Sequence, residues 1–233
     1  MSNVNTNSNN EADKYYQLII DVNGGSEITT TFTGCFEGIA DDEDGSLPTI
    51  SGLNHALFNT INGGKVKNII LDNVSISGGT NAGAICNEAT GDTRIYNCGV
   101  LATNSLVSTD DDGYTSITSN SSTISGSGYV GGIVGLLDGN SRVINCFSYA
   151  NITGGNEVGG IVGRNNVATT SAADNLKTMV MNCMFYGNIT GGTNKAPIYN
   201  GTNIINKDET GVGNYNYFLA EATFTGGIDT YNC

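Results

Sequence analysis

Residues 129–155 read YVGGIVGLLDGNSRVINCFSYANITGG, and residues 158–192 repeat the same order of groups around an insertion. The second copy begins VGGIVGRNN at Val158 and ends VMNCMFYGNITGG at Gly192. Both copies carry Val-Gly-Gly-Ile-Val-Gly, an apolar strand, Asn-Cys and a closing Asn-Ile-Thr-Gly-Gly. This repetition predicts stacked structural units, because one such unit cannot bury its apolar face alone.

Fainter copies on both sides align on one asparagine per unit. Parallel coils stack about 4.8 Å apart, so equivalent residues form ladders. Asparagine suits a bend in such a ladder, since it tolerates the left-handed region and its amide can bond the next asparagine. The Gly-Gly pairs are expected to supply positive φ at tight corners. The predicted ladder positions are Asn68, Asn97, Asn145, Asn182 and Asn216, with Asn232 as a further candidate.

The chain has no amphipathic helical stretch of useful length, and its apolar residues recur in short alternating patches. The sequence therefore predicts an all-β fold, a right-handed parallel β-helix (β-solenoid) forming a single domain with polar loop insertions. The insertions are expected near residues 105–125 and 168–178. Residues 1–13 are expected to be a polar tail and residues 14–233 the solenoid. The closing Tyr231-Asn232-Cys233 resembles the start of another repeat, so we expect the native chain to continue.

The charge balance disfavours several partners. Nine Lys and Arg residues against 22 Asp and Glu residues give a net charge of −13. Such a chain cannot form a phosphate-binding stripe, so we expect no nucleic-acid partner. No apolar run approaches the roughly 20 residues of a membrane span, and no signal peptide is visible. We expect no membrane insertion.

The stretch from residue 130 to residue 166 resembles the GLUG repeat, which occurs in large secreted and surface proteins of bacteria. Upstream, FTGCFEG at 32–38, TISGL at 49–53 and the Leu57-Phe58 pair resemble the segment that opens such arrays. The resemblance covers most of residues 15–233. It implies a right-handed β-helix, an extracellular or cell-surface location, and no catalytic residue within the repeat. The chain departs from the pattern at Cys35 and in the acidic insertion 41–44.

The six cysteines lack the short Cys-Cys spacings of metal sites. Cys98, Cys146 and Cys183 each follow a ladder asparagine, so they are expected to stack as a column. A buried reduced column and one or more disulfides are both open, because stacked coils bring Cα atoms near disulfide range.

Two acidic clusters precede glycine turns and are candidate calcium ligands. Neither matches the EF-hand spacing, and solvated loop charge is the alternative; we otherwise expect no cofactor. The candidate ligands are Asp41, Asp42, Asp44, Asp110, Asp111 and Asp112, with Glu43 inside the first cluster.

Tyr149 and Tyr186 share one repeat position and should stack on one face. A row of tyrosines can form a sugar-binding platform, because each ring is apolar with a polar tip. A ladder at the edge of the core is the competing interpretation. The single histidine, His55, has no orienting partner in the local sequence, and no catalytic residue is assigned.

Three functions follow from these features. The first is a non-catalytic structural or adhesive module of a bacterial surface protein, whose loops bind a glycan or a host protein. The second is a carbohydrate-active β-helix, a polysaccharide lyase or hydrolase, with candidate residues Asp138, Arg142, Glu157 and Arg164. The third is a filament subunit that associates end to end, since open β-helix ends are unpaired edges. The expectation for activity is that the protein is not an enzyme.

Overall fold

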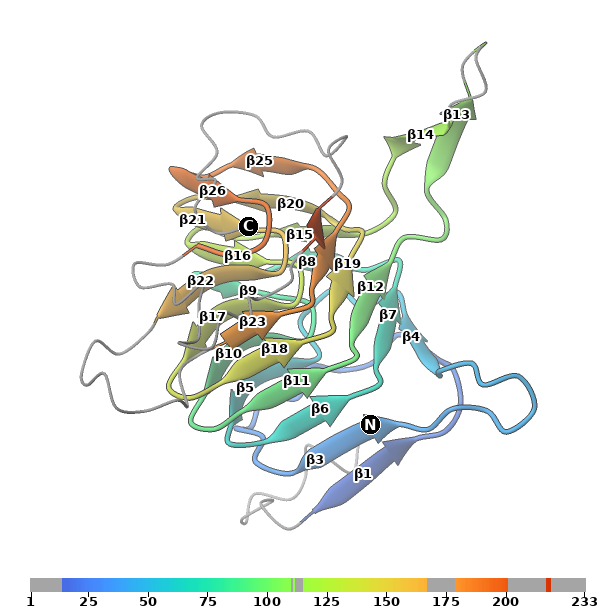
Figure 1. Cartoon of the computed structure of the whole chain (residues 1–233), viewed down its shortest axis with the longest axis vertical. Helices are drawn as coiled ribbons and strands as arrows, with labels where there is room; N and C mark the ends of the chain where they lie inside the picture. Colours follow the sequence, from blue (N-terminus) through green and yellow to red (C-terminus); the bar gives the residue numbers. More distant parts are fainter. Residues whose placement is uncertain (1–13, 110, 112–114, 167–178, 201–216, 219–233) are drawn as a thin grey trace, which may run out of the picture.

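The computed structural model describes residues 14–109, 111, 115–166, 179–200 and 217–218, which form strands and no helix. Neighbouring strands come from successive turns of the chain and run parallel, so the coils stack into a solenoid (Figure 1). The predicted all-β parallel solenoid is confirmed. The predicted tail (1–13) and the ladder residue Asn216 lie outside the described residues.

Sheets A and B lie side by side (Figure 1). The chain bends between them at the ladder asparagines, and we call this the ladder bend. In the described part, sheet A contains β1 (Tyr15–Leu18), β3 (Cys35–Gly38), β6 (Lys65–Lys67), β11 (Arg94–Tyr96), β18 (Arg142–Ile144) and β23 (Met179–Met181). Sheet B contains β2 (Val22–Asn23), β4 (Thr49–Ser51), β7 (Ile70–Asp72), β12 (Gly99–Leu101), β19 (Phe147–Ser148), β24 (Met184–Phe185) and β27 (Tyr217–Phe218).

Three further sheets complete each full coil, which passes through sheets E, C, A, B and D in that order. Sheet C contains β5 (Phe58–Asn62), β10 (Cys86–Thr90), β17 (Val134–Asp138) and β22 (Val162–Asn166). Sheet D contains β8 (Ser75–Ser77), β15 (Thr123–Ser125), β20 (Asn151–Gly154) and β25 (Ile189–Gly191). Sheet E contains β9 (Asn81–Ala82), β16 (Tyr129–Gly131), β21 (Glu157–Gly159) and β26 (Asn194–Ala196).

The core consists of apolar rows that run along the solenoid axis. In-register pairing stacks residues of one kind on their counterparts in the next coil, and alternation along each strand turns them inward. The rows with buried members include Val66–Ile95–Val143–Val180 in sheet A and Ile76–Ile124–Ile152–Ile189 in sheet D.

The first predicted insertion forms an antiparallel hairpin of β13 (Leu106–Thr109) and β14 (Thr115–Ser119), which projects from the stack between sheets B and D (Figure 1). The second, at residues 168–178, lies outside the described residues.

Of the four Gly-Gly pairs in the two quoted copies, one has the predicted positive φ and three do not. Gly131, Gly132, Gly159 and Gly160 are absent from the described positive-φ residues, whereas the Gly191-Gly192 pair has φ of 72° and 73°. A Cβ atom on Gly131 or Gly159 would lie within 3 Å of backbone atoms of the same or the next coil. At Gly131 and Gly159, glycine is therefore required because backbones approach closely there, and not because the backbone is left-handed.

Candidate functional site

The ladder asparagines lie in one row at the bend between sheets A and B. Asn68, Asn97, Asn145 and Asn182 have φ of 59°, 53°, 55° and 50°. The side-chain Nδ2 of Asn97 donates to Oδ1 of Asn68 at 3.2 Å, and Nδ2 of Asn145 donates to Oδ1 of Asn97 at 3.3 Å. The amides therefore satisfy one another along the bend, as a structural ladder does.

The cysteines that follow them lie on the inner side of the same bend. Cys98, Cys146 and Cys183 are buried, and each thiol donates to the backbone oxygen two residues earlier, at 3.2 to 3.3 Å. No disulfide joins the described cysteines. Burial raises the pKa of the Cys146 and Cys183 thiols, because the charged thiolate is disfavoured away from water. These thiols are held protonated near neutral pH.

The first acidic cluster lies in the exposed loop between β3 and β4. Oδ1 of Asp41 accepts from the backbone N–H of Glu43 at 2.7 Å, and Oδ1 of Asp44 accepts from that of Ser46 at 2.8 Å. Hydrogen bonds from the side chain and backbone of Ser46 lower the pKa of Asp44. Asp42 and Asp111 are exposed, while Asp110 and Asp112 lie outside the described residues.

No three His, Cys, Asp or Glu side chains gather around a metal-sized space in the part of the chain that the structure describes. Calcium binding stays a prediction.

The two tyrosines of the predicted ligand face lie one above the other. Tyr149 and Tyr186 are half-buried, with ring centroids 5.6 Å apart and planes at 84°, and Phe147 lies 5.8 Å from Tyr149. Edge-to-face contact of this kind stabilises the rings against each other. Their role in sugar binding stays a prediction.

A different surface combines polar groups from two sheets, at the corner where each coil turns from sheet E into sheet C. The sheet E row is Asn81, Tyr129, Glu157 and Asn194 in successive coils, and the sheet C row is Thr60, Glu88, Leu136 and Arg164. The rows face each other: Arg164 Nη1 lies 2.8 Å from Glu157 Oε1, and its guanidinium lies 5.1 Å from the centre of the Tyr129 ring. We call this surface the corner groove.

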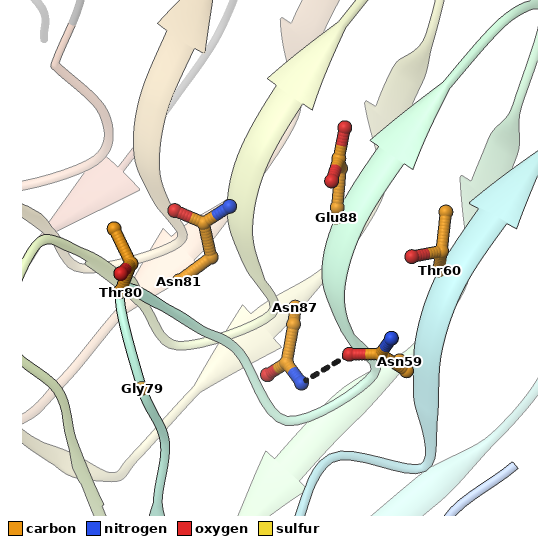
Figure 2. Close-up of a pocket in the computed structure, with 7 residues that line it drawn as sticks. All are labelled: Asn59, Thr60, Gly79, Thr80, Asn81, Asn87 and Glu88. Atoms are coloured by element: carbon orange, nitrogen blue, oxygen red, sulfur yellow. Dashed lines mark hydrogen bonds between the residues drawn. The ribbon is translucent and has the colours of Figure 1, made fainter. Parts of the chain in front are cut away.

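A polar pocket of about 230 Å³ lies at the lower end of the corner groove. Figure 2 shows its side chains, with Thr80 and Asn81 on one side, Thr60 and Glu88 on the other, and Asn59 and Asn87 at the base. Nδ2 of Asn87 donates to Oδ1 of Asn59 and to Oε1 of Glu27, each at 3.2 Å. The side-chain oxygens of Asn81 and Asn87 are buried and have no hydrogen-bond partner. Two of the residues that line the pocket thus carry an amide oxygen that is buried without a hydrogen-bond partner.

The place of the pocket follows from a difference between coils. Asn87 occupies the position of Gly135 in the next coil, since its neighbours Cys86 and Glu88 pair with Val134 and Leu136. A Cβ atom on Gly135 would lie 2.6 Å from the backbone N of Ala82 in β9 and 2.7 Å from the backbone O of Asn87. Among the described strands, none of sheet E lies below Asn87, because β9 is the first of that sheet. The side chain therefore fits there, and space remains beside it.

Sequence reasoning missed the pocket. Its signal was the seventh residue of the aligned motif, which reads Asn in NAGAICN (81–87) and Gly in YVGGIVG (129–135) and EVGGIVG (157–163). Of the four residues considered for polysaccharide chemistry, the structure brings Glu157 and Arg164 together. Asp138 instead accepts from the backbone N–H of Gly139 at 2.6 Å, and Arg142 lies in sheet A.

Comparison with known proteins finds a family for the first part of the chain. Residues 16–101 match the family described as the M26 IgA1-specific metallo-endopeptidase N-terminal region. The immunoglobulin A1 protease of Streptococcus sanguinis is 43% identical over 84 residues, which are 34% of this chain and 4% of that protein. That of Streptococcus pneumoniae strain ATCC BAA-255 / R6 is 40% identical over 80 residues, 33% of this chain and 4% of that protein. No solved structure matches.

These matches correct one expectation and support another. The expectation that the protein is not an enzyme is wrong, because the matching relatives are proteases and the matching family is part of a metallo-endopeptidase. The matched stretch spans about 4% of the length of these relatives, within a region named as N-terminal. The findings support a bacterial surface or secreted protein; the family model that matches is that of the M26 N-terminal region and not the GLUG repeat. No helix among the described residues is long and apolar enough to cross a membrane.

Proposed function

We propose that this chain is the solenoid region of a bacterial surface or secreted peptidase related to the M26 metallo-endopeptidases, and that the polar pocket at the lower end of its corner groove binds the ligand on which that peptidase acts. In this proposal the coils form one right-handed domain of GLUG-like repeats. The relatives' name makes immunoglobulin A1 the first protein ligand to test.

The observation that carries the proposal is the position of the polar pocket. All of its lining residues, from Asn59 to Glu88, lie inside the stretch that matches the M26 N-terminal region. Tyr149 and Tyr186 lie outside it. The pocket therefore belongs to the part of the chain that is similar to the peptidases.

The described residues do not fit the metal centre that the family name implies. Metallopeptidases of the His-Glu-x-x-His type need two histidines on one helix, whereas this chain contains one histidine and its described part contains no helix. Both ring nitrogens of His55 lie about 3 Å from backbone oxygens, 2.9 Å from that of Ala56 and 3.0 Å from that of Gly25. We therefore assign ligand binding, and no bond-breaking step, to this region.

Surface binding of the purified full chain tests the proposal. Immobilised immunoglobulin A1 and a panel of secreted glycoproteins would be titrated with the wild-type chain, and with Asn81→Ala and Asn194→Ala as a matched pair from one row of the groove. The proposal expects saturable binding that Asn81→Ala weakens and Asn194→Ala leaves unchanged. Equal loss in both variants, or no binding to any member of the panel, would contradict it.

A second candidate function is end-to-end association. The exposed large apolar side chains of the described chain cluster at and after β1, with Tyr15 53%, Ile19 68% and Ile20 68% exposed. Among the described strands, β1 is the terminal one of sheet A, and an apolar edge strand favours pairing with another chain. Light scattering should show a concentration-dependent rise in mass that the Ile19→Lys/Ile20→Lys double variant abolishes; a constant monomer mass in both proteins would reject it.

A further inference from the structure

We propose that the polar pocket of the corner groove binds one hydroxyl-rich saccharide unit. The proposal rests on the function above, because it names the chemical class of ligand that the same groove takes. It concerns the saccharide itself, either in a free polysaccharide or attached to a protein.

The unmet hydrogen-bonding groups define what the ligand must offer. Two side-chain oxygens, Asn81 Oδ1 and Asn87 Oδ1, are buried without a partner. The amide of Asn87 is held in its orientation, since its nitrogen already donates to Glu27 and Asn59. Buried polar groups without partners are costly, at about 1–3 kcal/mol each. A turn of the Asn81 amide toward a ligand group that donates to its oxygen would therefore be favoured.

The remaining lining adds groups that both donate and accept. Thr60 and Thr80 bring hydroxyls to opposite sides of the pocket, and the Glu88 carboxylate lies beside Thr60 (Figure 2). A sugar hydroxyl also donates and accepts, so neighbouring hydroxyls of one ring can meet amide, hydroxyl and carboxylate partners together.

Other classes of ligand fit less well. Ligand pockets for apolar molecules are lined mostly by apolar and aromatic side chains, but the lining here is asparagine, threonine, glycine and glutamate. Phosphate and other anions would meet Glu88 and a chain of net charge −13. A divalent cation favours several carboxylates, and the lining has one. An amine is the strongest competitor, because it donates to all the same oxygens.

The groove above the pocket suits a short chain of such units. Tyr129 follows Asn81 in the sheet E row, and Leu136 follows Glu88 in the sheet C row, so the next coil supplies an aromatic and an apolar side chain. One further coil up, the Glu157–Arg164 ion pair crosses between the two rows. Along the sheet E row, the distance from Asn81 to that pair is two coil steps, about 10 Å, and the Arg164 guanidinium lies over the Tyr129 ring between them.

The test uses the full chain and ligand-observed NMR with defined probes. The probes are neutral methyl glycosides, the same glycosides conjugated to serum albumin, and a lysine amide as the amine competitor. The proteins are wild type, Asn81→Ala, Glu88→Gln and the control Asn194→Ala, which changes an exposed asparagine of the same row. We expect one or more glycosides to bind, with affinity reduced five- to tenfold by Asn81→Ala and unchanged by Asn194→Ala. With one glycoside on each albumin, so that multivalency does not contribute, stronger binding of the conjugates identifies a protein-borne ligand, and equal binding identifies a free polysaccharide.

Two results with the small-molecule probes would overturn the inference while leaving the proposed function in place. One is glycoside binding that Asn81→Ala and Glu88→Gln do not alter; the other is binding of the lysine amide in preference to every glycoside. If the chain binds immunoglobulin A1 or another glycoprotein of the panel but no glycoside, the saccharide class is wrong and the groove binds protein. If it binds neither, both proposals fail.

Discussion

Two corners of the same coil use asparagine in opposite ways. At the bend between sheets A and B, Asn97 has a left-handed backbone and its amide bonds the asparagines above and below. At the corner between sheets E and C, Asn81 and Asn87 lack positive φ, and their side-chain oxygens have no partner. One residue type thus serves structure where its hydrogen bonds are met within the chain, and becomes a candidate for binding where they are not.

The largest expected effect comes from adding a side chain at Gly135, in the corner between sheets E and C, where the backbones approach closely. Gly135→Ala places a Cβ atom 2.6 Å and 2.7 Å from two backbone atoms, so the sheets must separate. We expect the free energy of unfolding in urea to fall by about 3 kcal/mol, the cost of overpacking against a rigid backbone.

Gly79→Ala is the matched control, because a Cβ atom at Gly79 meets nothing within 4 Å. A Gly135→Ala protein as stable as the Gly79→Ala control would show that the corner can open, and would remove the reason for a pocket in one coil alone.

The next effect tests the ladder bend. Asn97→Ala puts an alanine at φ of 53° and removes two side-chain hydrogen bonds. The free energy of unfolding should fall by about 2 kcal/mol. Asn97→Gly keeps the conformation accessible and should cost clearly less, so equal losses in the two variants would assign the effect to the amide and not to the backbone.

A smaller effect on stability depends on pH. It tests whether water is excluded from the inner side of the ladder bend. Burial raises the pKa of the Cys146 thiol above its ordinary 9.0, so its contribution to stability is complete below pH 9.0 and is lost as the pH rises. Between pH 8 and pH 10 the wild type should lose about 1.4 kcal/mol more than Cys146→Ala, in reducing buffer. Parallel pH profiles for the two proteins would mean that water reaches the thiol.

The parallel solenoid and its ladder bend could be predicted from the sequence, because the residues that form them recur in each repeat. Asn97 and Asn145 are each followed by Cys and preceded by an apolar strand, so the alignment alone places them in one row. The pocket could not be predicted in this way, because it depends on a position where one repeat differs from the others. Asn87 replaces a glycine only where sheet E has no strand below it, and the coil at which a sheet begins is set by the whole stack. The prediction of positive φ at Gly131 was wrong for a related reason. The sequence of one repeat does not show how closely its backbone approaches the next coil.

The most direct test of the account measures unfolding and ligand affinity on the same two variants, Asn81→Ala and Asn97→Ala. Asn81→Ala should keep the wild-type free energy of unfolding within about 0.5 kcal/mol and lose five- to tenfold in affinity for the best-binding glycoside or glycoprotein. Asn97→Ala should lose stability and keep its affinity at temperatures where it remains folded. If instead Asn81→Ala unfolds more readily and binds as the wild type does, the corner groove is a structural seam and the central claim is wrong.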